Sequence, residues 1–272
     1  MAITLAVVAP GLGPAAAATP RGPHKATGRP ACGPVGSAGP PPPNDPYWSS
    51  QWNLCRIRAP AAWTVSTGRG VRIGIVDTGV DRTQPDLSAK VVATADCLGA
   101  DGDPGRCRTG PGAARDDNGH GTAVAGLAAA TTNNDLGVAG TAPAADLVVA
   151  KALTARGSGT FGDVNAGIEW TVNHGAQVVN LSLGAGGPVV AGPAASSTSL
   201  LPGIDYAWSH GAVPVLAAGN TDALGQATTL GNGSVPALVV GATGPEDRPA
   251  PYSSPTGDAP WALVAPGGSA GP

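Results

Sequence analysis

The chain has little charge and no strong excess of either sign. Only 12% of its 272 residues are charged, and the formal net charge is −3. A chain of this charge has no basic field to attract nucleic acid. After the first twenty residues, no apolar stretch is long enough to cross a membrane. We therefore expect a protein that spans no membrane and has no nucleic-acid partner, and 42% apolar residues suffice for one α/β domain with a sizeable core.

The 42 glycines and 28 prolines are unevenly placed, and many of the prolines lie before residue 47. Residues 2–18 form an apolar, alanine-rich run that ends in Ala-Ala-Ala-Ala-Thr-Pro, as in the hydrophobic region and cleavage site of a secretory signal. No positively charged region precedes this run, so we expect the true start to lie upstream. The predicted organisation is a signal-like segment (1–19), a linker or propeptide remnant (20–43) and a folded domain (44–272). A flexible alanine- and proline-rich tail is the alternative to export.

The four cysteines contain no Cys-x-x-Cys pair, which argues against a zinc site. An even number of cysteines in an exported chain is usually oxidised. Three pairings are possible. The nearest in sequence joins Cys97 to Cys107 and leaves Cys32 to pair with Cys55.

From residue 71 onward, strand-like and helix-like segments alternate. This rhythm predicts a three-layer α/β fold, a mostly parallel sheet with helices on both faces. Short runs rich in β-branched residues predict strands at 71–76, 90–95, 146–153, 177–182, 212–217, 237–242 and 261–264. Helices are predicted at 59–63, 122–130, 162–174 and 200–210.

Two polar residues stand out against this pattern. Asp77 ends the first strand of the sheet, at the carboxyl edge where parallel sheets collect ligands and catalytic groups. His120 lies between two glycines before an alanine-rich helix, so its ring can face a cleft. A carboxylate that holds the imidazole Nδ1–H leaves Nε2 free to take a proton from a nucleophile. Read singly, the aspartate is a turn-capping residue and the histidine an incidental helix start.

Taken together, 75–81 and 118–122 resemble the first two signature blocks of the subtilisin-like serine proteases, peptidase family S8. The stretches 132–143, 179–184, 215–220 and 264–267 fall where that family has its later blocks, and 43–47 is similar to the mature start of its thermitase-like members. The resemblance implies a subtilisin-like fold and a serine endopeptidase with Asp77 and His120 in the catalytic triad and Asn220 in the oxyanion hole. An aspartic protease is the alternative for Asp-Thr-Gly alone, but it would have no use for the Gly-His-Gly-Thr block.

The same resemblance implies an extended peptide or protein substrate and a monomeric enzyme. One wall of the substrate site would be formed by Ser182, Leu183 and Gly184, and the other by Ala217, Ala218 and Gly219. Small residues leave the first specificity pocket open for a fairly large apolar side chain.

No cofactor is expected for catalysis, but the resemblance implies a structural calcium ion. The implied ligands are carboxylate, amide and carbonyl oxygens, as calcium prefers, from Asp45, Asp86, Thr131, Asn134, Leu136 and Val138. The alternative is a set of solvated polar residues. Asp101 and Asp103 offer a second ion less support, because acidic glycine-rich loops are usually only solvated.

The catalytic serine block of the family, Gly-Thr-Ser-Met-Ala-x-Pro, is absent from the 272 residues. Ser269 is rejected as the nucleophile, since Gly267 belongs to the preceding block and no helix follows. We therefore expect a domain that is incomplete at its C-terminus, truncated before the serine, and inactive as written. A catalytically inactive relative that binds peptides or acts as an inhibitor is the alternative function.

Overall fold

The computed structural model describes residues 4–6, 41–185, 199–221, 227–228, 235–256 and 259–269. Within these residues, eight strands form one sheet in the order β13-β12-β9-β7-β2-β5-β3-β4. All neighbours are parallel except β3 and β4. The strands are β2 (Arg72–Asp77), β3 (Val91–Asp96), β4 (Arg108–Thr109), β5 (Asp146–Lys151), β7 (Val178–Leu181), β9 (Val213–Ala217), β12 (Leu238–Thr243) and β13 (Ala262–Pro266).

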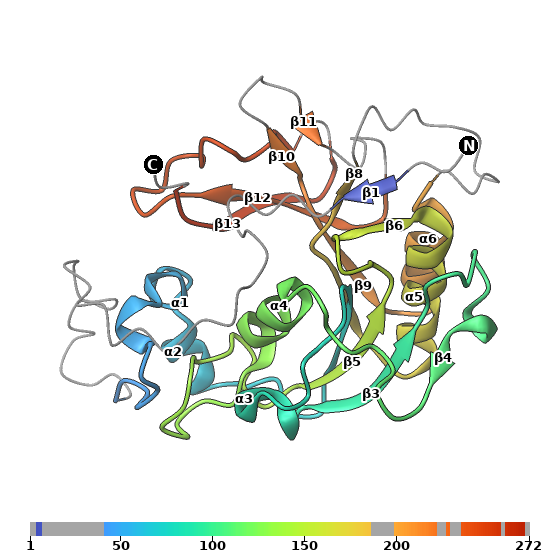
Figure 1. The fold of residues 1–272 in the computed structure, drawn as a ribbon. Coiled ribbons are helices and arrows are strands. Elements are labelled where there is room, and N and C mark those ends of the chain that lie inside the picture. Colours follow the sequence, from blue (N-terminus) through green and yellow to red (C-terminus); the bar gives the residue numbers. More distant parts are fainter. Residues whose placement is uncertain are drawn as a thin grey trace.

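Helices cover both faces of the sheet, and the predicted α/β architecture is thereby confirmed (Figure 1). The main helices are α4 (His120–Ala129) on one face and α5 (Phe161–Asn173) and α6 (Leu201–Ser209) on the other. Shorter ones are α1 (Trp52–Arg56), α2 (Ala59–Trp63), α3 (Pro85–Ser88) and two 3₁₀ turns, Trp48–Ser50 and Pro104–Arg106.

Strand β2 shows why both faces need a cover. Successive side chains of a strand point to opposite faces. Ile75 is fully buried in the cluster that contains Ala125 of α4, whereas Val76 is fully buried in the cluster that contains Val164 of α5. A strand buried on both faces has a continuous apolar sequence, as 73–76 does.

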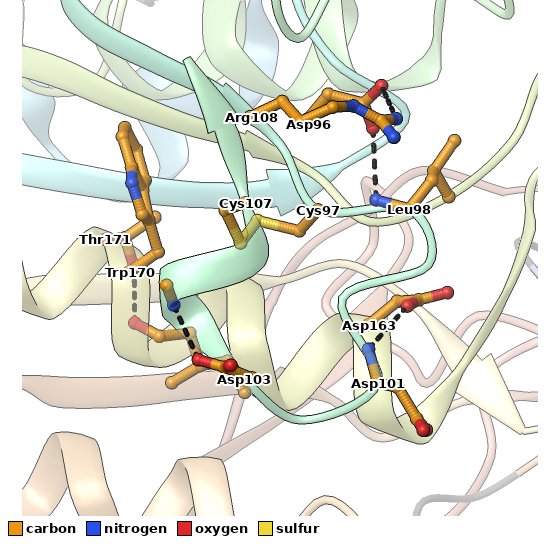
Figure 2. The surroundings of a disulfide bond; sticks show 12 residues. Asp96, Cys97, Leu98, Asp101, Asp103, Cys107, Arg108, Asp163, Trp170 and Thr171 are labelled. Carbon is orange, nitrogen blue, oxygen red and sulfur yellow. Dashed lines mark hydrogen bonds and ion pairs between the residues drawn. A yellow bond between two sulfur atoms is a disulfide. The ribbon is translucent and has the colours of Figure 1, made fainter.

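The disulfide Cys97–Cys107 is present, as predicted (Figure 2). It closes the loop between β3 and β4, and Arg108 pairs with Asp96 beside it at 2.7 Å. Cys55 is also disulfide-bonded, and none of the described cysteines is free. Its predicted partner, Cys32, lies outside the described residues.

The segment that precedes the sheet packs against the loop between α4 and β5 through a small apolar cluster. Trp48, Leu54 and Ala59 are buried together with Ala139, and the indole of Trp63 donates to the Thr141 carbonyl at 2.9 Å. Helix α2 has the predicted bounds, with proline in its first turn.

Most of 1–19 and 20–43 lies outside the described residues. The exception within 1–19 is β1 (Thr4–Ala6), which pairs antiparallel with both β6 (Ser158–Thr160) and β8 (Gly184–Ala185). Figure 1 shows this small sheet at the upper right, close to α6. A further pair joins β10 (Asn220–Thr221) to β11 (Ala227–Thr228). No helix among the described residues is long and apolar enough to span a membrane.

Candidate active site

Asp77 and His120 meet at the carboxyl edge of the sheet. Asp77 is the last residue of β2 and is fully buried, and His120 is the first residue of α4. The imidazole Nδ1 lies 2.8 Å from Oδ1 and 3.0 Å from Oδ2 of the carboxylate. The histidine side chain is 18% exposed, so the ring is largely buried but still reaches solvent. This geometry fixes the tautomer with the proton on Nδ1 and leaves Nε2 as a proton acceptor.

Two glycines allow the two elements to approach this closely. The backbone of Gly79 has φ 113°, which disfavours any other residue. A Cβ on Gly121 would overlap the Gly79 carbonyl oxygen and lie 3.2 Å from the Asp77 Cβ. The Gly121 amide also donates to the Thr78 hydroxyl at 2.9 Å. The first turn of α4 is therefore packed directly on the turn that follows Asp77.

The loop before His120 is organised around Asp116, which the sequence analysis missed. Its carboxylate accepts from the amides of Asn118, Gly119 and Thr122 at 2.8–3.0 Å and from the Thr122 hydroxyl at 2.5 Å. It also accepts from the Thr78 hydroxyl at 2.9 Å. Burial raises the pKa of Asp116, but these hydrogen bonds outweigh burial and lower the pKa to about 2. Asp116 thus stays ionised and ties the His120 loop to the Asp77 turn.

The charges around His120 favour its protonated form. Burial lowers the pKa of His120, but the hydrogen bond to Asp77 and the negative charges of Asp77 and Asp116 raise it more. The net result is a pKa above the ordinary histidine value. A raised pKa makes the imidazole a stronger base near neutral pH.

Most of the predicted substrate-site residues, together with Asn220, lie around one cavity of about 350 Å³. Ser182, Ala217, Ala218, Gly219 and Asn220 line this cavity. Leu183 is instead 2% exposed and packed in the core, and Gly184 lies in β8 beside β1. Residues 182–184 were predicted to form one wall of the substrate site, but the structure places them in three different environments.

The loop 131–138 surrounds two buried carboxylates. Asp45 is 3% exposed and accepts from the Asn133 amide at 3.0 Å. Asp86 is 4% exposed and accepts from the Asn134 side chain at 2.8 Å and the Val138 amide at 3.1 Å. A Cβ on Gly137 would overlap the Asp86 carboxylate, so the loop folds tightly over it.

Within the described residues, no cationic side chain forms an ion pair with either Asp45 or Asp86. Two buried anions without a cationic side chain fit a bound hard cation. The described residues contain no group of three or more His, Cys, Asp or Glu side chains that could hold a metal. Such a cation would therefore need carbonyl and amide oxygens in addition, as the predicted set supplies.

A parallel α/β sheet with a carboxylate–imidazole pair at its carboxyl edge is typical of hydrolases that activate a nucleophile. The subtilase family model matches residues 68–271. The chain belongs to the subtilase family, and its homology is to the subtilisin-type serine proteases.

The relatives it resembles include thermitase from Thermoactinomyces vulgaris, 44% identical over 65% of this chain and 58% of thermitase. A thermophilic serine proteinase from Bacillus sp. (strain AK1) is 39% identical over 78% of this chain and 48% of the proteinase. The chain thus spans about half the length of these relatives. Among solved structures, a protease from Pseudoalteromonas arctica PAMC 21717 superposes with a TM-score of 0.66 and 28% identity, over 85% of this chain and 74% of that chain.

Proposed function

We propose that the chain belongs to a serine endopeptidase that hydrolyses peptide bonds through an acyl-enzyme. The observation that carries the proposal is the contact between buried Asp77 and His120 Nδ1. That contact is what a general base for serine needs. The family membership supports the same function.

In this mechanism, His120 Nε2 takes the proton of a serine hydroxyl while the serine oxygen attacks the substrate carbonyl carbon. The protonated His120 then gives that proton to the leaving amine, and the acyl-enzyme forms. In the second half of the reaction, His120 takes a proton from water while the water oxygen attacks the acyl-enzyme carbonyl carbon. The protonated His120 then returns the proton to the serine oxygen, and the peptide is released as a carboxylic acid. Asp77 stabilises the imidazolium, and the Asn220 amide donates to the oxyanion from the cavity rim.

The substrate would be an extended peptide. β1 already lies as an extended strand between β6 and β8, so these two strands can hold a third chain by backbone hydrogen bonds. Residues 182 and 217–219 line the neighbouring cavity, whose size and apolar walls suit a large apolar side chain.

We also propose a calcium ion held by Asp45, Asp86, the Asn134 side chain and the carbonyls of Thr131, Leu136 and Val138. The buried carboxylates support it. A bound calcium would neutralise both carboxylates and stabilise the folded loop. Export is proposed on the disulfides, which persist in oxidising compartments.

The 272 residues contain no Gly-Thr-Ser block that would supply the serine for this reaction. Ser269 lies exposed after β13, and among the described contacts no serine side chain bonds to His120. The second candidate function, a peptide-binding relative without catalysis, rests on this observation.

One experiment separates the two functions. The coding sequence is read past the codon for Pro272, and both the 272-residue chain and any extended product are treated with a serine-directed phosphonate. If the protein is a peptidase, we expect a Gly-Thr-Ser-like block in frame. The extended product should then be labelled, and the 272-residue chain should not. A stop codon in place of that block, with peptide binding intact, supports the binding protein. Labelling of the shorter chain that Ser269→Ala abolishes would overturn the rejection of Ser269.

A further inference from the structure

Lys151 is a buried cation that the proposed chemistry does not use. It ends β5 and lies opposite Asp77 in the strand register. Its side chain is only 7% exposed. A buried lysine of this kind requires acceptors for all three of its N–H groups.

The three acceptors come from three different segments. The ammonium donates to the Thr78 carbonyl at 2.6 Å and to the Leu153 carbonyl at 2.9 Å, and it pairs with the Asp117 carboxylate at 2.7 Å. Thr78 directly follows the catalytic Asp77, Asp117 lies three residues before His120, and Leu153 leads toward β6. One charged group therefore joins the Asp77 turn, the His120 loop and the segment between β5 and β6.

A second hydrogen bond also joins the His120 loop to the segment that follows β5. The side-chain amide of Asn118 donates to the Ala155 carbonyl at 2.9 Å, so consecutive residues of the His120 loop are held to the segment after β5. The Asn118 side-chain oxygen in turn accepts from the His120 amide at 3.1 Å. The backbone of the histidine is thus connected to the same segment that Lys151 anchors.

Lys90 is a second lysine that donates to a backbone carbonyl, but it lies far from the Asp77–His120 pair. It is also partly buried and donates to a backbone carbonyl, that of Pro143, at 2.7 Å. It precedes β3, however, and so lies at the amino-terminal edge of the sheet, away from Asp77 and His120. Lys90 is therefore a control for the loss of a partly buried, hydrogen-bonded ammonium away from the site.

We propose that Lys151 is a positioning residue that holds Asp77 and His120 in register through Thr78 and Asp117. It does not touch the reacting atoms. Its three charge-assisted hydrogen bonds hold the loop at Thr78 and the loop at Asp117, which lie roughly 40 residues apart in the chain. Each such bond is stronger than a hydrogen bond between neutral groups. The role rests on the proposed function, because it matters only if the Asp77–His120 pair is the catalytic base.

The test uses the 272-residue chain and needs no proteolysis. Its four histidines are labelled with nitrogen-15, and His120→Gln identifies the His120 signals. Two quantities are followed by NMR: the deshielded Nδ1 proton of the Asp77–His120 hydrogen bond, and the pKa of His120. Lys151→Met and Lys90→Met are compared with the parent, with melting temperatures alongside.

The sign of the pKa change separates positioning from charge. Removal of a nearby cation alone raises the pKa of His120, as the remaining anions Asp77, Asp116 and Asp117 act unopposed. Loss of the Asp77 contact lowers the pKa of His120, because the hydrogen bond and the negative charge of Asp77 favour the protonated imidazole. We expect Lys151→Met to lower the pKa and to broaden or abolish the Nδ1 proton signal. Lys90→Met should leave both unchanged, even if its melting temperature falls as far.

Three outcomes would contradict the proposals in distinguishable ways. If Lys151→Met keeps the Nδ1 proton signal with an unchanged or raised pKa, Lys151 has no positioning role, while the proposed function stands. If the parent lacks the signal, the Asp77–His120 pair is absent and both proposals fail. If Lys151→Met does not fold, Asp117→Asn decides, since it leaves the lysine its two carbonyl acceptors: a broadened signal supports positioning, and a signal as sharp as in the parent overturns it.

Discussion

The hydroxyl of Thr78 donates to the carboxylate of Asp116 at 2.9 Å, across 38 residues of chain. The same hydroxyl accepts from the Gly121 amide. Thr78, the residue after Asp77, therefore contacts the His120 loop on both sides of the histidine. The stability of the site depends on Asp116 being ionised, because only the carboxylate accepts all of its hydrogen bonds.

The first prediction concerns acid. The pKa of Asp116 is lowered to about 2 in the fold, below its unfolded value. Its stabilisation is thus present above the unfolded pKa and is lost as the pH falls through about 2. At neutral pH, Asp116→Asn should lower the free energy of unfolding by about 1–2 kcal/mol, after allowance for its half-buried position. Urea unfolding at several pH values measures this difference.

The difference between Asp116→Asn and the parent should shrink below about pH 4, as the parent carboxylate becomes protonated. Asp205→Asn, an exposed change on α6, serves as the control and should show almost no difference at any pH. A gap for Asp116→Asn that stays constant from neutral to acid pH would contradict the prediction.

The second prediction concerns His120, for which the sign is opposite. Its pKa is raised in the fold, so its stabilisation is complete below the unfolded histidine pKa and is lost as the pH rises through the folded one. The parent should lose stability across that window, and Asp77→Asn should remove the loss. In a product that carries the serine block, activity should rise over the same window, because catalysis needs neutral His120. A rise in activity centred below the ordinary histidine pKa would contradict this prediction.

The long strands and helices could be predicted because their signal is local. The apolar run 73–76 and the helical spacing of Val164 and Ile168 are visible in the sequence, and the structure places them in β2 and α5. β6 and β8 were missed because strands of two or three residues carry no periodic pattern. The short helices α1 and α3 were missed for the same reason.

The Asp77 and His120 positions stood out because each combines a polar residue with a strand end or a glycine pair. The bond of Asp116 to Thr78 and the bonds of Lys151 to Thr78 and Asp117 join segments 34 to 73 residues apart, which no local pattern encodes. One signal for Lys151 was available: a lysine that ends an apolar strand run is buried only if it is paired. It indicated a partner but not which one.

The third prediction concerns calcium. If a calcium ion binds between Asp45, Asp86 and the loop 131–138, it stabilises the folded state by mass action. A chelator should then lower the melting temperature, and added calcium should restore it. Asp86→Ala should abolish most of the response, while Asp205→Ala should keep it. An unchanged melting temperature in EDTA would remove the basis for the calcium site.

The last prediction compares two glycines of α4, one at the site and one along the same helix. A Cβ at Gly121 would overlap the Gly79 carbonyl oxygen and crowd the Asp77 Cβ, whereas a Cβ at Gly126 has no heavy atom within 4 Å. Gly121→Ala should therefore cost about 1–3 kcal/mol of unfolding free energy through overpacking. Gly126→Ala should be neutral or gain up to about 1 kcal/mol, because alanine favours helix interiors.

Because Gly79 and Asp77 share one turn, the Gly121→Ala overlap should also displace the carboxylate from His120. The Nδ1 proton signal should then weaken in Gly121→Ala and remain sharp in Gly126→Ala. Urea unfolding and the NMR spectrum of the same two samples measure both effects. Equal stability of the two variants would mean that α4 can move away from the turn after Asp77, and the close packing assigned to Gly121 would not be what holds His120 against Asp77.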